Sequence, residues 1–112
     1  MKTELLKGIQ PFWFWNGKME EEEIRRQIRE MADKGIRGFL IHSRQGMEIP
    51  YLTEDYFDRV GVAVEEAKKH GLEVWLYDEY PYPSGVSAGK VMLDHPEYCC
   101  KALTKTVKTV TG

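Results

Sequence analysis

The sequence has no long apolar run, no excess of basic residues and few cysteines. No stretch approaches the roughly 20 apolar residues of a membrane span. The first ten residues carry only Leu5, Leu6 and Ile9 as large apolar side chains, too few for the core of a signal peptide. With 16 basic and 18 acidic residues, the chain lacks the positive surface that nucleic acids and anionic membranes attract. These absences predict a chain that is cytoplasmic as it stands and has neither nucleic acid nor membrane as a partner.

The two cysteines, Cys99 and Cys100, are adjacent. A disulfide between neighbours is strained and closes no loop, so a disulfide framework is excluded. The pair does not form a C-x-x-C motif, and no second cysteine pair completes a zinc site. The simplest interpretation is two reduced thiols beside a strand.

The residues that are present, 42% hydrophobic and 30% charged, are typical of one small globular domain. Three short runs of strand formers alternate with two amphipathic helical stretches. The strands are expected at residues 12–15, 38–43 and 72–77. The first helix begins in the acidic run Glu20 to Glu23, buries Ile24, Ile28 and Met31, and ends at Gly35. The second begins after the N-cap Thr53, ends at His70-Gly71, and is expected to bury Phe57, Val60, Val64 and Ala67.

The order β-α-β-α-β, with strands of about 5 residues and helices of about 15, predicts an α/β fold with parallel strands joined by right-handed crossovers. A complete (β/α)₈ barrel needs about 250 residues, so we expect a partial barrel. Residues 1–96 would form it, with a helical turn at residues 91–93. Residues 97–112 would begin an inserted β segment, because residues 102–110 alternate polar and apolar side chains.

Polar and aromatic residues follow each predicted strand. Because ligands of parallel α/β folds bind at the carboxyl ends of the strands, these residues are expected at one rim. Convergent aromatic rings, carboxylates and a histidine suit a polyhydroxylated ligand, whose rings stack on aromatic faces. The predicted substrate-binding residues are Trp15, Asn16, His42, Arg44, Asp78, Glu79 and Tyr82.

Several of these residues have a structural alternative. Trp13 and Trp15 alternate with phenylalanines, so either tryptophan can be a core residue. His42 can be a buried histidine with a satisfied ring. Arg44 can be a solvated loop charge or a partner of Asp78. The pair Asp78-Glu79 is the sharpest signal, since core packing does not explain two carboxylates directly after an apolar strand.

Four stretches together resemble the start of the barrel in glycoside hydrolase family 106, the α-L-rhamnosidase-like enzymes. They are Pro11 to Gly17, Gly35 to Phe39 with His42 and Arg44, Pro50 to Thr53, and Tyr77 to Glu79 with Pro83 to Gly85. The sequence departs from the family at Tyr80 to Tyr82, where relatives carry a small acidic-glycine-aromatic segment. Because of this departure, the resemblance does not indicate which sugar is recognised.

The resemblance implies a hydrolase that removes terminal, rhamnose-like sugars from polysaccharides, with Ca²⁺ as a cofactor in some members. Glycoside hydrolysis needs two carboxylates that flank the bond, and the resemblance places them on later strands. The chain alone is therefore expected to be inactive, with its catalytic and metal residues unassigned. Two alternatives stay open: a non-catalytic carbohydrate-binding module, and a half-barrel that forms a homo-oligomer through its open sheet edges.

Overall fold

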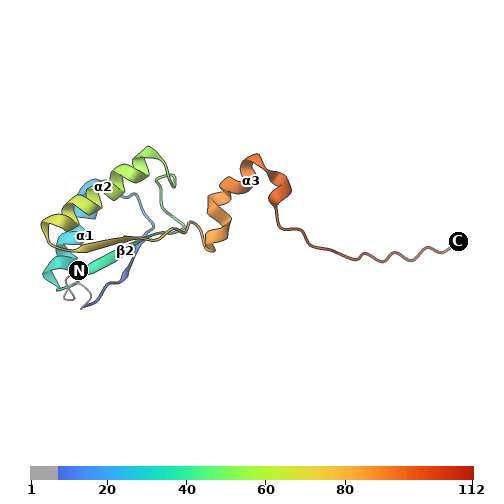
Figure 1. Cartoon of the computed structure of the whole chain (residues 1–112). Helices are drawn as coiled ribbons and strands as arrows, with labels where there is room; N and C mark the ends of the chain where they lie inside the picture. Colours follow the sequence, from blue (N-terminus) through green and yellow to red (C-terminus); the bar gives the residue numbers. More distant parts are fainter. Residues whose placement is uncertain (1–7) are drawn as a thin grey trace.

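The computed structural model describes residues 8–112 and contains a three-stranded parallel sheet in the order β1-β2-β3 (Figure 1). The strands are β1 (Phe12–Trp15), β2 (Gly38–Ser43) and β3 (Glu73–Leu76), and they alternate with α1 (Glu21–Asp33) and α2 (Glu54–Lys69). The predicted β-α-β-α-β order with parallel strands is confirmed. Leu5 and Leu6, on which the signal-peptide argument depends, lie outside the described residues.

The register of the sheet separates its side chains into two faces. Trp13 pairs with Ile41, and Ile41 pairs with Leu76, so these three side chains share one face. Both helices cover that face and pack against each other (Figure 1). The opposite face carries Phe14 and His42, and no helix of residues 8–112 lies over it. The fold therefore leaves one face of the sheet open.

Helix α1 forms where its acidic first turn and apolar stripe predict it. Glu21, Glu22 and Glu23 occupy the first turn, where the helix dipole favours negative charge. Ile24 and Ile28 are buried against the sheet. The helix ends because Gly35 adopts a φ of 81°, a left-handed conformation that is strained for other residues.

Helix α2 begins at the predicted N-cap, where the hydroxyl of Thr53 accepts a hydrogen bond from the backbone N–H of Tyr56. The predicted apolar stripe is partly wrong, because Phe57 is 48% exposed and Val64 is 45% exposed. The buried stripe is Tyr56, Ala63 and Ala67. Two apolar stripes lie one residue apart along this helix, and their periodicity alone does not decide which one faces the sheet.

Apolar side chains of α2 and of the β3 edge border an apolar groove. Val60 and Val64 face it from the helix, and Leu72, Val74 and Leu76 face it from the sheet edge. The groove has a volume of about 590 Å³, and Leu76 remains 53% exposed. The β3 edge of the domain is thus apolar and without a neighbour among residues 8–112.

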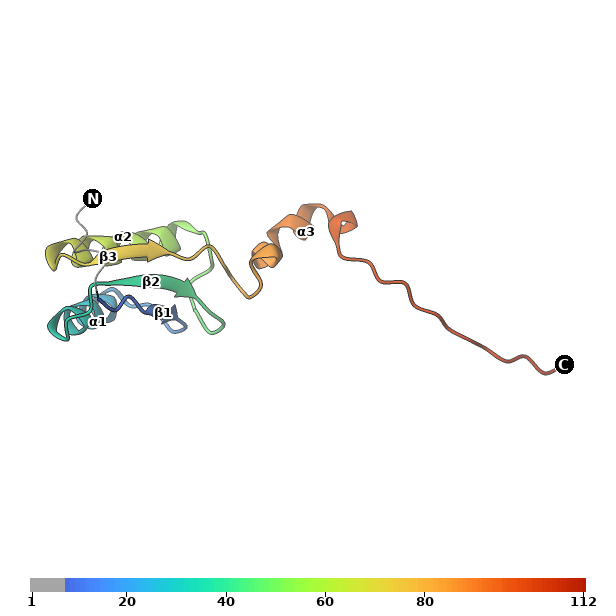
Figure 2. The ribbon, with the colours of Figure 1, turned by 60° about the horizontal axis from the view of Figure 1, so that its bottom comes forward.

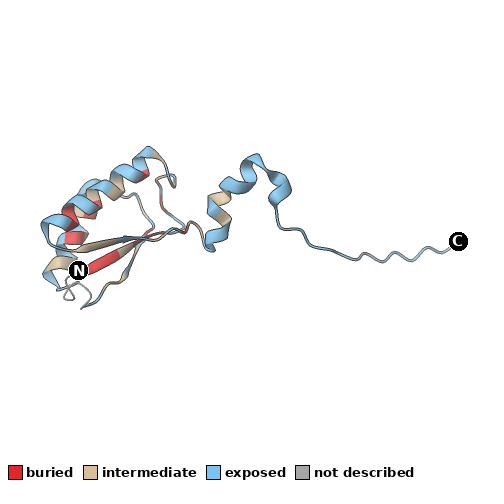
Figure 3. Ribbon diagram, in the orientation of Figure 1, coloured by how far each residue is buried: buried red, intermediate tan, exposed pale blue. Residues whose placement is uncertain are grey.

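Beyond β3 the chain leaves the sheet and ends in an extended tail (Figure 2). Short helical segments come first: η2 (Ser84–Gly89), α3 (Lys90–Asp94) and η3 (Pro96–Tyr98). Helix α3 confirms the helical turn predicted at residues 91–93. The strand predicted at residues 102–110 is wrong, since residues 100–112 form neither strand nor helix and are exposed (Figure 3). Alternating side chains form a strand only when another strand supplies backbone partners, and no strand within residues 8–112 pairs with the tail.

None of the helices in residues 8–112 combines the length and apolar character required to cross a membrane.

Candidate functional site

The open face of the sheet is a continuous layer of rings at the carboxyl ends of the strands. The ring of His42 lies 5.4 Å from that of Phe14, 5.5 Å from that of Phe12 and 4.4 Å from that of Tyr77. Phe12 also meets Tyr77 edge to face at 5.3 Å. These contacts keep His42 buried although no helix in the described part of the chain covers this face. Residues of β1 and β2 and the residue that follows β3 therefore form one platform, as the parallel arrangement predicts.

A buried carboxylate lies beside this histidine. The Nε2 atom of His42 is 3.6 Å from a carboxylate oxygen of Glu79, and both side chains are buried. The side chain of Tyr77 forms a hydrogen bond with Glu79. The Nδ1 atom of His42 is buried and has no hydrogen-bond partner among the described residues. Buried polar atoms are nearly always paired, so this nitrogen is unusual.

The electrostatics of this cluster favour a neutral histidine. Burial lowers the pKa of His42 below its ordinary value of 6.5, and the positive charge of Arg44 lowers it further, against the opposing effect of Glu79. The negative charge of Glu79, burial and the hydrogen bond with Glu79 raise the pKa of Tyr77 above 10.0. At neutral pH the cluster thus combines a neutral imidazole with a protonated phenol.

A cavity of about 440 Å³ adjoins the ring platform and brings together three of the predicted residues. Asn16 follows β1, Arg44 follows β2 and Tyr82 follows β3, so each strand supplies one of them. The guanidinium of Arg44 lies 4.8 Å from the ring centre of Phe14, a cation–π contact that orients the arginine. The remaining lining residues are Gln45 and Pro81. The cavity therefore offers amide, guanidinium and aromatic groups, and none of its lining residues is a carboxylate.

Two of the predicted residues lie elsewhere. Trp15, predicted to bind substrate, is 0% exposed, packs against Tyr56 on the face that the helices cover, and does not line the cavity. Asp78 is exposed and does not line the cavity, and Arg44 forms no ion pair with it among the described residues. Successive residues of an extended chain point in opposite directions, so Glu79 turns inward where Asp78 turns outward.

Five residues of the site were absent from the sequence-based set. The ring platform includes Phe12, Phe14 and Tyr77, and the cavity is also lined by Gln45 and Pro81. The alternation of Phe14 with Trp15 was the available signal, because only one of two neighbouring strand residues can face the helices. Gln45 belongs to a loop, where no periodicity indicates the direction of a side chain.

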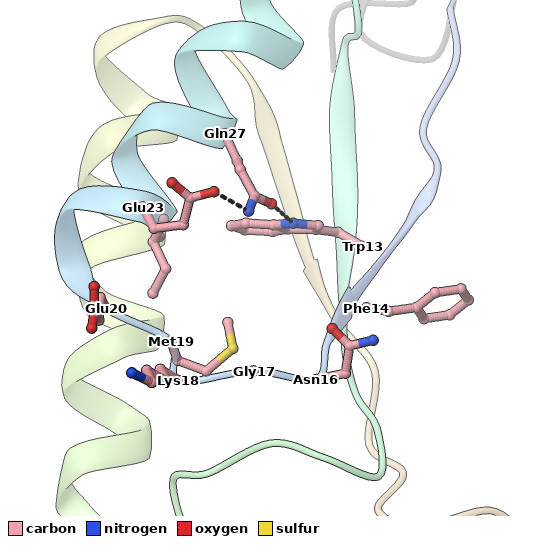
Figure 4. A pocket seen from close by; sticks show the side chains of 10 residues that line it. Trp13, Phe14, Asn16, Gly17, Lys18, Met19, Glu20, Glu23 and Gln27 are labelled. Carbon is pink, nitrogen blue, oxygen red and sulfur yellow. Dashed lines mark hydrogen bonds between the residues drawn. The ribbon is translucent and has the colours of Figure 1, made fainter.

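A second cavity, of about 280 Å³, lies between β1 and the start of α1 (Figure 4). Its wall is a chain of hydrogen bonds in which Trp13 Nε1 donates to Gln27 at 2.7 Å, and Gln27 Nε2 donates to Glu23 at 2.7 Å. Arg26 donates to the same carboxylate. Each of these polar groups already has a partner, so we assign this wall to structure and Trp13 to the core.

The loops that carry Asn16 and Arg44 are held together by a close backbone approach. Gly46 has a φ of 97°, and a Cβ atom there would lie 2.9 Å from the carbonyl oxygen of Asn16. We expect Gly46→Ala to lower the free energy of unfolding by about 1–3 kcal/mol, since both strain and the contact oppose the new methyl group. Urea denaturation followed by circular dichroism measures the change.

Gly61 is the matched control for this substitution. It lies inside α2, and a Cβ atom there would meet nothing within 4 Å. Gly61→Ala should stabilise the protein by about 0.5–1 kcal/mol through helix propensity. Equal effects of the same sign at the two glycines would contradict the described loop packing.

The site does not fit a calcium ion. Calcium takes roughly six to eight oxygen ligands, and several carboxylates usually supply them. Within residues 8–112 no three side chains of histidine, cysteine, aspartate or glutamate are grouped to hold a metal ion. The carboxylate of Glu79 is beside an imidazole and a phenol instead. We therefore assign no step of any reaction to calcium.

Comparisons with protein-family models, with curated proteins and with solved structures find no match to this chain.

Proposed function

We propose that the chain is the opening part of a (β/α)₈-barrel glycoside hydrolase related to family 106, and that it binds sugar at the rim without cleaving it. The strand order β1-β2-β3 with both helices on one face supports the barrel, because each added unit then curls the sheet the same way. One half of a doubly wound sheet has the same strand order and helix placement, so the choice of the barrel depends on the family resemblance. The open aromatic face then corresponds to the inside of the barrel.

The observation that carries the sugar-binding proposal is the cavity shared by Asn16, Arg44 and Tyr82. Amide and guanidinium groups form hydrogen bonds with hydroxyls, and the exposed ring of Tyr82 offers a stacking surface. His42 does not line this cavity, its Nδ1 atom is buried and its Nε2 atom lies beside Glu79, so we assign it to the ring platform and not to direct sugar contact.

The same arrangement supports binding without cleavage. Glycoside hydrolysis needs a general acid and a second carboxylate on either side of the bond. Neither Asp78 nor Glu79 lines the cavity. Glu79 is engaged with His42 and Tyr77, which fits a role in positioning these rings. In this proposal the catalytic carboxylates belong to later strands of a complete barrel.

The proposal predicts weak binding of rhamnose and of rhamnose-terminated oligosaccharides to the 112-residue chain, with no turnover of aryl-rhamnosides. A monosaccharide in a half-open site should have a dissociation constant on the order of a few millimolar. Calorimetry measures it. Arg44→Ala should abolish the heat signal because it removes the charged donor of the cavity.

Arg29→Ala is the matched control, since Arg29 lies on α1 away from the cavity. It should leave sugar binding unchanged. Sugar binding that survives Arg44→Ala, or that is lost in both variants, would contradict the assigned site. Robust turnover by the chain alone would contradict the absence of a catalytic pair.

Self-association through the sheet edges is the second candidate, and the apolar groove between α2 and β3 favours it. In the barrel proposal the next βα unit of a complete barrel covers this groove. Sedimentation velocity on the calorimetry samples separates the two, because a monomer at high concentration excludes a stable homo-oligomer.

A further inference from the structure

The segment after the sheet folds back on itself and brings two sulfur atoms together. The thiol of Cys99 donates to the thioether of Met92 across 3.1 Å, although seven residues separate them. The turn η3 makes this approach, and the backbone N–H of Cys99 donates to the carbonyl oxygen of Pro96 at 3.1 Å. Both cysteines are exposed, and Met92 is partly exposed. The two sulfurs are therefore close to each other and open to solvent.

Side chains within the turn stabilise this geometry. His95 Nδ1 lies 3.0 Å from a carboxylate oxygen of Glu97, and the ring of His95 stacks on that of Tyr98 at 4.8 Å. A backbone hydrogen bond and the hydrogen bond with His95 lower the pKa of Glu97, so this carboxylate is ionised at neutral pH. The side chains of Glu97 and His95 are thus engaged with each other, and the sulfur atoms of Met92 and Cys99 form a separate pair of soft ligands beside this turn.

A second thiol follows directly at Cys100. Residues 100–112 form no helix or strand, so the backbone at Cys100 can rotate without breaking secondary structure. Thiolate and thioether sulfurs are soft ligands, which select copper(I) over hard cations. Zinc usually takes four nitrogen, oxygen or sulfur ligands, and the described residues hold no group of three histidine, cysteine or acidic side chains for it.

We propose that Met92, Cys99 and Cys100 form a binding site for copper(I), separate from the sugar site. Binding replaces the two S–H bonds by two Cu–S bonds, releases two protons and adds the Met92 thioether as a third ligand. Copper remains in the +1 state and no electron is transferred. The affinity should therefore fall as the pH is lowered, because protons compete for the thiolates.

The test is an anaerobic titration of the reduced 112-residue chain with copper(I) against the chromophoric chelator bicinchoninate. We expect one copper per chain. Cys99→Ser and Cys100→Ser should each weaken binding more than about 100-fold, beyond the usual effect of losing an outer-shell partner. Met92→Leu should weaken it about tenfold.

Met31→Leu, on α1 and far from both cysteines in the sequence, is the control and should leave copper affinity unchanged. Circular dichroism verifies that each variant keeps the fold. Failure to take copper from the chelator would overturn the proposal, and so would affinity that survives either serine substitution. One copper bound per two chains, measured by sedimentation, would overturn a site within one chain.

Discussion

Phe39→Ala should lower the free energy of unfolding by about 3–5 kcal/mol, the range for truncating a buried aromatic residue. The side chain of Phe39 is 0% exposed on β2, the central strand of the sheet, and its ring meets Trp13 edge to face at 4.9 Å. Small domains are often stable by only about 5 kcal/mol, so the variant should be largely unfolded at modest urea concentrations. Urea titration followed by far-ultraviolet circular dichroism measures the loss.

Phe12→Ala is the matched control on the neighbouring strand. Phe12 is 51% exposed on the open face, so truncation should cost about 1 kcal/mol. The same change from phenylalanine to alanine is thus made once on each face of the sheet, and the two losses in the free energy of unfolding are compared. A larger loss at Phe12 than at Phe39 would mean that the helices cover the other face.

Glu66→Gln should remove about 2 kcal/mol of stability, because it breaks buried charge-assisted hydrogen bonds between the helices. The carboxylate of Glu66 is buried and accepts from Arg25 at 2.9 Å, and it lies 3.2 Å from Nε2 of His70. Lys69 and Arg29 complete its cationic surroundings at 3.6 and 3.5 Å. Thermal and urea unfolding measure the loss.

The pH dependence of the free energy of unfolding also reports on the carboxylate of Glu66. Burial alone raises the pKa of Glu66, but hydrogen bonds from Arg25 and His70 and the charge of Lys69 outweigh it and bring the pKa from 4.5 to about 2. A pKa lower in the folded state gives stability that is fully present above about pH 4.5 and is lost as the pH falls towards 2. Glu66→Gln should therefore flatten the acid side of the stability profile.

Glu65→Gln is the control for this substitution. Glu65 precedes Glu66, also contacts Arg25 and Lys69, and keeps 60% of its side chain exposed. Exposed ion pairs contribute little, so the variant should stay close to the parent at every pH. Equal losses from the two substitutions would indicate that burial of Glu66 does not matter to the fold.

The elements of this fold follow from local patterns in the sequence. Residues 39–41 are apolar strand formers, and β2 extends around them from Gly38 to Ser43. Thr53 caps the start of α2 with its side chain, and Gly35 ends α1 with a left-handed backbone. Both residues mark helix ends as predicted. Patterns of this kind depend only on near neighbours along the chain.

The features that sequence reasoning missed depend on distant partners. Trp15 was assigned to the site because four aromatic residues in a row do not indicate which pair faces the helices. The buried stripe of α2 lies one residue from the predicted stripe, because the helix carries two apolar stripes side by side. The tail was expected to be a strand, but a strand needs a neighbour that its own sequence does not specify. The rim positions of Asn16, Arg44 and Tyr82 were predicted because parallel topology determines them.

The most direct test of the proposed sugar site is a two-dimensional NMR titration of the isotope-labelled chain with a rhamnose-terminated oligosaccharide. We predict that the largest shift changes fall on Asn16, Arg44, Gln45 and Tyr82, with smaller changes at His42, and that the solvent-facing side of α1 is unaffected. Saturating changes confined to the helices, or no changes at tens of millimolar sugar, would contradict the assignment of this rim as the ligand site.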